Sequence, residues 1–355
     1  MTGIWWEYLT IFLVSALLCM ALSPLAMAVA LRVGMLDRPS AHKSHQSPVP
    51  YLGGVAIVVA FSASVMVATL VNPPASGGDE LVVVLLLALG LAFVGLADDL
   101  RNLSPVVRLL AEVACAVVLW RMDAGITLVG EPILDGALTV LWVVGITNAF
   151  NLLDNMDGLS AGQAALCSMT LFAVAASNGQ FLVAGLAIGL AGCAVGFLRH
   201  NFHPARIYMG DGGALFLGFV ISYLGVKLRF ETDVSESFIV PVIACAVPIL
   251  DTSLVTFSRL AIGRSPFVGG QDHVSHRLVA SGLPVPVAVG STYFASASIG
   301  VLCLVISRVD PMSAWIIAAL ISVTLLLGGV LLALVPVYPE SRRRHFVIEE
   351  KSPSD

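Results

Sequence analysis

Three acidic residues stand in short polar stretches whose composition suits chemistry on phosphate groups. Asp98 and Asp99 are adjacent in GLADDLRNLS, and Asp211 lies among glycines in IYMGDGG. Carboxylates are hard oxygen ligands that suit Mg²⁺, and a glycine-rich helix N-terminus lets a phosphate approach the backbone. Adjacent helical residues point about 100° apart, so we expect one acid of the pair to face the site and the other to orient a partner. A solvated helix end and a capped turn are the ordinary alternatives.

The longest polar stretch, NAFNLLDNMDGLSAG, follows an apolar segment directly. If the helix continues through it, amide and carboxylate side chains recur at every third residue: Asn148, Asn151, Asp154 and Asp157. Residues three apart are neighbours on a helix, so these four would form one polar row that ends at Gly158. A polar loop would explain Asp157, but the asparagines lie at membrane depth, where unpaired polar groups are costly. The row therefore favours a metal or substrate site.

A fourth cluster, RSPFVGGQDHVSHRL, combines basic and imidazole side chains, namely Arg264, His273, His276 and Arg277. The spacing of the two histidines would suit zinc, but no cysteine is near and the other clusters carry oxygen ligands. Phosphate binding fits this cluster better, with a solvated basic loop as the alternative. The loop DRPSAHKSHQSPVPYLGG, with Lys43, either binds phosphate or only supplies positive charge.

Asp251, in VPILDTSL, is an acid inside an apolar segment and is a functional candidate for that reason. Pairing with Arg259 explains it equally well. Glu112 is a similar but weaker candidate.

These clusters interrupt a chain of 355 residues that is 58% hydrophobic and only 12% charged, whereas a soluble domain carries about 25% charged residues. The fold class predicted is an all-α integral membrane protein with about eleven transmembrane helices. The expected spans are 8–31, 51–72, 80–97, 105–120, 134–150, 161–177, 180–198, 213–228, 238–258, 286–306 and 312–336. We expect one membrane domain over 1–337 and a disordered charged tail over 338–355.

The distribution of basic residues predicts the topology. With the N-terminus outside and the C-terminus in the cytoplasm, 14 of the 18 Lys and Arg face the cytoplasm, as the positive-inside rule requires. The same arrangement gathers the polar clusters in catalytic loops on the cytoplasmic face. This suits an enzyme that takes a water-soluble substrate, whereas an ion-coupled transporter would place its charges near mid-membrane. The net charge of −5 suggests no nucleic-acid partner.

The stretches GLADDL, NAFNLLDNMDGLSAG, IYMGDGG and DHVSHRL resemble, in order, the motifs of the polyprenyl-phosphate N-acetylhexosamine-1-phosphate transferases. The resemblance runs from about Gly34 to Leu278. It implies transfer of a sugar-1-phosphate from a UDP-sugar to polyprenyl phosphate, with UMP released and Mg²⁺ required, Mn²⁺ being the second option. It also implies a multi-pass protein of the inner membrane, in contact with membrane lipids. The oligomeric state stays open, with a homodimer as one option.

The resemblance also assigns roles. Catalytic side chains are expected at Asp98, Asp99, Asp154, Asp157 and His273, with Asp98 acting on the lipid phosphate as a base or by orienting it. Substrate contacts are expected at Asn148, Arg108, His276, Arg277, Arg264 and Lys43. The metal ligands are expected to be Asn151 and Asp211.

Two positions depart from the family pattern. Asn155 replaces the usual glycine between the two acids of the second motif, and Ser275 replaces a histidine of the His-x-His-His motif. These departures leave the sugar open: GlcNAc is favoured, with GalNAc, QuiNAc or MurNAc-pentapeptide as alternatives. A CDP-alcohol phosphotransferase would need an Asp- and Gly-rich signature within one span, which we do not find. A non-catalytic scaffold would tolerate loss of Asp98 or Asp211.

Overall fold

The structure is a computed structural model and describes residues 4–37, 48–73, 77–228 and 234–337. Lys43 and the tail 338–355 lie outside these residues. The regular secondary structure within them is helical apart from two short strands, β1 (Leu36–Asp37) and β2 (Val49–Pro50), which pair antiparallel. The first seven helices are α1 (Trp5–Val33), α2 (Gly53–Val71), α3 (Gly78–Arg101), α4 (Pro105–Arg121), α5 (Pro132–Leu153), α6 (Leu159–Ser177) and α7 (Phe181–Asn201). The remaining six are α8 (Gly210–Lys227), α9 (Val234–Ala244), α10 (Ala246–Ala261), α11 (Val274–Ala280), α12 (Val285–Ile306) and α13 (Pro311–Ala333).

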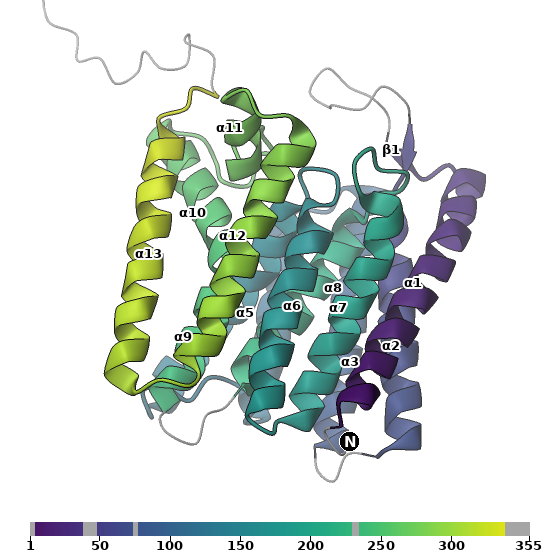
Figure 1. Ribbon diagram of the computed structural model, residues 1–355. Helices are drawn as coiled ribbons and strands as arrows, with labels where there is room; N and C mark the ends of the chain where they lie inside the picture. Colours follow the sequence, from purple (N-terminus) through teal and green to yellow (C-terminus); the bar gives the residue numbers. More distant parts are fainter. Residues whose placement is uncertain (1–3, 38–47, 74–76, 229–233, 338–355) are drawn as a thin grey trace, which may run out of the picture.

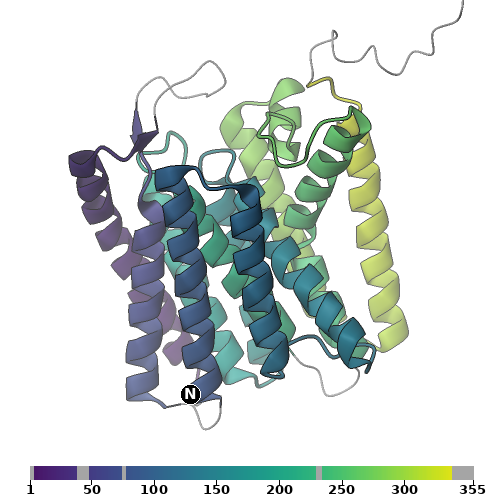
Figure 2. The same ribbon diagram turned by 180° about the vertical axis from the view of Figure 1, so that it is seen from behind.

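The long helices run side by side in one bundle (Figure 1). The start of α1 lies at one end of this bundle, and β1, the short helix α11 and the last turn of α13 lie at the other (Figures 1 and 2). We call the end with β1 and α11 the site end, because α3 and α5 finish there and α8 begins there. The polar clusters of the sequence therefore meet at one end of the bundle.

Eight helices in the described ranges are long and apolar enough to cross a membrane, or nine if the bent pair of α9 and α10 counts as one span. This confirms the all-helical class and agrees with an integral membrane protein that crosses the membrane several times. The expected spans 105–120 and 213–228 form α4 and α8, which do not belong to these eight. The figure of eleven spans and their orientation stay predictions.

Helix α8 is the centre of the bundle, and every residue from Gly212 to Val226 is buried. Glycines let its neighbours approach closely, as is common where membrane helices pack. A Cβ added at Gly95 of α3 would lie 2.5 Å from the backbone nitrogen of Gly212. A Cβ at Gly218 would lie 2.7 Å from Cα of Thr147 on α5. Because protein rather than lipid surrounds α8, its ends can carry Asp211 and Lys227.

The segment predicted as one span over 238–258 is bent by 66° between α9 and α10. Pro248 explains the break, because proline lacks the N–H that would bond to the carbonyl four residues earlier, and its ring clashes with that carbonyl. The break falls at Cys245, just after that carbonyl at Ala244. The redirected α10 carries Asp251 and Arg259 towards α11.

Candidate active site

Arg108 joins two acidic residues that are far apart in the sequence. Its Nη1 atom donates to Oδ2 of Asp98 and to Oδ2 of Asp211, each at 2.6 Å. The Asp98 side chain is 9% exposed, whereas those of Arg108 and Asp211 are 23% and 31% exposed. The cluster is therefore sheltered on the Asp98 side and reachable from the Asp211 side. One guanidinium therefore lies between two acidic side chains.

The turn between α3 and α4 places Arg108 over Asp98. Asn102 ends α3 in a left-handed conformation with φ of 49°, which few residues other than glycine and asparagine tolerate. Ser104 then caps α4 by accepting a hydrogen bond from the Val106 nitrogen, and Pro105 occupies the first helical position. Arg108 thus falls in the first turn of α4.

Asp99 faces α8 instead of Arg108. Its carboxylate accepts hydrogen bonds from the backbone nitrogens of Asp211 at 3.1 Å and Gly212 at 3.5 Å. Gly210 has φ of 74°, and a Cβ there would lie 2.6 Å from Asp99 Oδ2, so no other residue fits easily. The expectation that this helix N-terminus offers its N–H groups to phosphate is therefore wrong for these two groups, because Asp99 already occupies them. The two adjacent acids do divide into one that faces Arg108 and one that orients α8.

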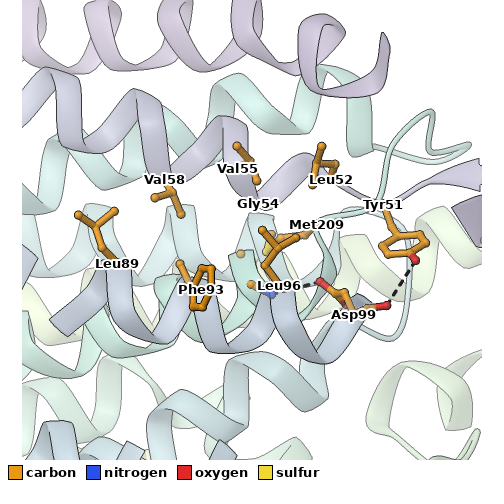
Figure 3. Close-up of a pocket in the computed structure, with 13 residues that line it drawn as sticks. Tyr51, Leu52, Gly54, Val55, Val58, Leu89, Phe93, Leu96, Asp99 and Met209 are labelled. Atoms are coloured by element: carbon orange, nitrogen blue, oxygen red, sulfur yellow. Dashed lines mark hydrogen bonds between the residues drawn. The ribbon is translucent and has the colours of Figure 1, made fainter. Parts of the chain in front are cut away.

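An apolar pocket of about 160 Å³ opens beside Asp99, between α2 and α3. Figure 3 shows Tyr51 and Asp99 at one end of it and Val58 and Leu89 at the other. The Tyr51 hydroxyl donates to the backbone carbonyl of Asp99 at 3.3 Å, which ties the start of α2 to the end of α3.

The predicted polar row after α5 is only partly helical. Helix α5 ends at Leu153, so Asn148 and Asn151 are helical whereas Asp157 lies in a turn. The Asp157 carboxylate accepts from the Ala205 nitrogen at 3.0 Å and contacts His203 Nδ1 at 2.8 Å. The prediction of a helical row that continues through Asp157 is therefore wrong, because hydrogen bonds between Asp157 and the 203–205 loop stabilise a turn at this position.

The members of this row have different surroundings. The Asn148 amide donates to the Glu112 carboxylate and to the carbonyl of Val144, so its side chain forms a contact between α5 and α4. Asn151 is half-buried in the last turn of α5 at the site end. Burial, with the negative charges of Asp99 and Asp157, raises the pKa of the Asp154 carboxyl to about 7. That influence of Asp99 shows that the end of α5 lies close to the α3 acids.

Asp251 holds His273. The sequence left two interpretations of Asp251 open, a functional acid or a partner of Arg259. Asp251 is 1% exposed and accepts from His273 Nδ1 at 2.7 Å and from the Val274 nitrogen at 2.6 Å. A carboxylate accepts hydrogen bonds, so Asp251 favours a proton on Nδ1, which leaves Nε2 as the ring nitrogen that can face a ligand. Arg259, the other partner considered for Asp251, forms a buried two-bond ion pair with Asp272.

His276 lies near His273, with their ring centres 5.7 Å apart. Burial and the neighbouring His273 together lower the pKa of the His276 imidazole to about 4, so this ring is neutral at pH 7. Its Nδ1 atom is buried with no hydrogen-bond partner among the described residues. A buried nitrogen without a partner is costly, so it is a candidate contact for substrate.

Two arginines proposed as substrate ligands have partners within the protein. Arg277 is 1% exposed and donates to the carbonyls of Leu332 and Val335, each at 3.1 Å, at the end of α13. Arg264 donates to the carbonyl of Gly269 at 2.8 Å within its own loop. This geometry favours a structural role for Arg277, and a substrate role for either residue stays a prediction.

The donors at the site end suit magnesium only in part. In residues 4–37, 48–73, 77–228 and 234–337, no three or more His, Cys, Asp or Glu side chains group in a way that could hold a metal ion. Mg²⁺ is, however, commonly held by one or two carboxylates together with substrate phosphates and water. Asp211, the more exposed acid of the cluster, fits a cation that arrives with a diphosphate.

Known proteins are similar to this chain in sequence. A profile of glycosyl transferase family 4 matches residues 81–229. A probable undecaprenyl-phosphate N-acetylglucosaminyl 1-phosphate transferase from Bacillus subtilis is 32% identical over 281 residues, covering 77% of each chain. The chain belongs to glycosyl transferase family 4.

Two further relatives show the range within the family. A decaprenyl-phosphate N-acetylglucosaminephosphotransferase of Mycolicibacterium smegmatis is 31% identical, over 72% of this chain and 71% of the relative. A phospho-N-acetylmuramoyl-pentapeptide-transferase of Geobacillus kaustophilus is 33% identical, over 61% of this chain and 74% of the relative. The part that matches the family profile runs from α3 to the end of α8, so it contains the whole Asp98–Arg108–Asp211 cluster.

Proposed function

We propose that this member of glycosyl transferase family 4 transfers N-acetylhexosamine-1-phosphate from a UDP-sugar to polyprenyl phosphate. An oxygen of the lipid phosphate attacks the phosphorus that carries the sugar, and the bond from that phosphorus to the bridging oxygen breaks. UMP leaves with the bridging oxygen, and polyprenyl-diphosphate-sugar is formed. The named relatives support this reaction class. GlcNAc is our first choice of sugar.

The observation that carries this proposal is the position of Arg108 between Asp98 and Asp211. A guanidinium binds phosphate well and is always charged. Asp98, which is the more buried acid, holds Arg108 in place, so Arg108 orients the lipid phosphate for attack. The lipid phosphate is already ionised at pH 7 and needs little further activation by a base.

We infer that Asp211, with Asn151 as a second oxygen donor, binds Mg²⁺ on the diphosphate of the UDP-sugar. When bound, the metal would neutralise charge on the phosphates and on the leaving UMP. Asp99 keeps Asp211 in position by capping α8, and Asp251 keeps Nε2 of His273 available to the diphosphate.

We also propose that the protein resides in the inner membrane with the site end in the cytoplasm. The excess of Lys and Arg in the loops assigned to that end supports this orientation. UDP-sugars are made in the cytoplasm, so that orientation also gives the site its soluble substrate.

Release of UMP by the purified protein tests the proposal. The protein is incubated with undecaprenyl phosphate, Mg²⁺ and one UDP-sugar at a time from a panel that includes UDP-GlcNAc and UDP-GalNAc. We expect UMP with at least one sugar, loss of release in EDTA, and restoration by Mg²⁺ or Mn²⁺. The absence of UMP with every sugar would overturn the enzyme assignment. Full activity of Asp211→Asn would overturn the metal assignment alone.

A further inference from the structure

A side-chain hydrogen bond joins the loop after α5 to the helix α11. The Ser275 hydroxyl donates to Oδ1 of Asn155 at 2.8 Å. Asn155 in turn donates from Nδ2 to the carbonyl of Leu152 at 2.8 Å, which fixes the orientation of its amide. Ser275 is 1% exposed and Asn155 is half-buried, so water competes little for this bond.

This bond joins the loop that carries two of the expected catalytic acids to the segment that carries the two histidines. Asn155 directly follows Asp154 and precedes Asp157 by two residues. Ser275 lies in the chain between His273 and His276. The Asn155–Ser275 bond therefore links the segment with the imidazoles directly to the α5 loop.

The two partners are also the two positions where the chain departs from the family pattern. A glycine at 155 has no side chain to reach α11, and a side chain larger than serine at 275 would meet Asn155, which lies 2.8 Å from the Ser275 hydroxyl. The departures compensate each other, because side-chain volume is added at one position and removed at the other.

We propose that Asn155 and Ser275 act as one positioning unit that holds His273 and His276 against the UDP-sugar site. The two residues do not touch the substrate but act through α11, and this rests on the proposed function. Neither residue can play this role without its partner, because the role depends on the bond between them.

A double-mutant cycle tests this coupling. Each of Ser275→Ala and Asn155→Ala removes the same bond, so we expect each to lower kcat/KM for the UDP-sugar about tenfold. The double variant should then also lose about tenfold rather than about a hundredfold, because coupled residues are not additive. The KM for polyprenyl phosphate should not change in any of the three. Independent, multiplicative losses, or no loss in the single variants, would overturn the proposal.

A swap towards the family pattern tests whether side-chain volume at the two positions is compensated. Ser275→His alone should lower kcat/KM for the UDP-sugar by at least about a hundredfold, because a larger side chain is forced into a filled space. Adding Asn155→Gly should bring it back to within about tenfold of the wild type. Failure of the second substitution to restore activity would contradict the proposal.

The matched control is a second Ser–Asn contact at the other end of α6, where Asn178 donates to Ser177 at 3.4 Å. Alanine at either position should leave the kinetics unchanged. Melting temperatures of the Asn155–Ser275 cycle separate this proposal from the proposed function, since they report the coupling even in a protein that transfers no sugar. Additive melting shifts would overturn the coupling, whereas coupled shifts without any UMP release would overturn only the transferase assignment.

Discussion

At the scale of single residues, Arg108 determines the electrostatics of the site. It offers one nitrogen to two carboxylates that would otherwise repel each other across a short distance. Asp98 is the more buried partner, and its charge is costly without a counter-charge.

Replacing Arg108 by alanine should therefore lower kcat/KM for polyprenyl phosphate by about a hundredfold, which corresponds to about 2.7 kcal/mol. Arg108→Lys should retain part of the activity, because the charge remains while the two-acid contact is lost. Arg121→Ala, at the other end of α4, serves as the control and should keep full activity. Wild-type kinetics in Arg108→Ala would remove this residue from the mechanism.

Asp251 is expected to act on His273 rather than on substrate. In Asp251→Asn the side chain keeps its size, but an amide can also stabilise the wrong tautomer of the imidazole. We predict that kcat falls at least about a hundredfold while KM for the UDP-sugar changes less than about threefold. The measurement is steady-state kinetics with each substrate varied in turn. A loss confined to KM would mean that Asp251 supports binding and not the orientation of His273.

The raised pKa of Asp154 predicts a pH dependence of stability. The pKa of this carboxyl is about 7 in the folded protein, against an ordinary value of 3.8, so the folded protein holds the proton more tightly than the unfolded chain does. The contribution of Asp154 to stability is therefore fully favourable below about pH 4 and is lost as the pH rises to about 7.

The melting temperature measured in EDTA should fall between pH 4 and pH 7 in the wild type. The fall should be smaller in Asp154→Asn, which cannot ionise. If both proteins show the same slope, Asp154 is not the buried acid that titrates in this range.

At the scale of elements, close packing of α3 on α8 positions the site. Gly95→Ala would bring a Cβ to 2.5 Å from the Gly212 nitrogen, next to Asp211. We predict a loss of about 1–3 kcal/mol in the free energy of unfolding, together with reduced activity. Gly90→Ala on the same helix meets nothing within 4 Å and is the matched control. Thermal unfolding of both variants checks this, and equal melting temperatures would contradict the packing argument.

The sequence predicted the elements better than the contacts between them. The length of the apolar segments identified the long helices. The different roles of Asp98 and Asp99 followed from the angle between adjacent residues on a helix. The central position of α8 could not be predicted, because the sequence of a helix surrounded by protein is as apolar as that of a helix surrounded by lipid. The roles of Asp251 and Arg277 depend on partners 22 and 55 to 58 residues away, which no local pattern reveals. The turn at Asp157 likewise depends on a loop 46 residues further on.

At the scale of the whole molecule, the fold gathers its polar chemistry at one end of an apolar bundle. The start of α1 and the end of α13 lie at opposite ends of that bundle (Figure 1). The Asp98–Arg108–Asp211 cluster, the α5 loop and α11 share the site end, where a lipid headgroup and a soluble nucleotide can both arrive. The same arrangement leaves the outer faces of α1 and α13 apolar, as contact with lipid requires.

The most direct measurement follows the two phosphates of the sugar nucleotide separately. Purified protein is given undecaprenyl phosphate, Mg²⁺ and UDP-GlcNAc labelled with ³²P in either the α or the β phosphate, or the sugar that performs best in the panel. The account predicts that the β label moves into the lipid fraction while the α label stays in water-soluble UMP. Both labels remaining in soluble UDP while the sugar alone enters the lipid would contradict it.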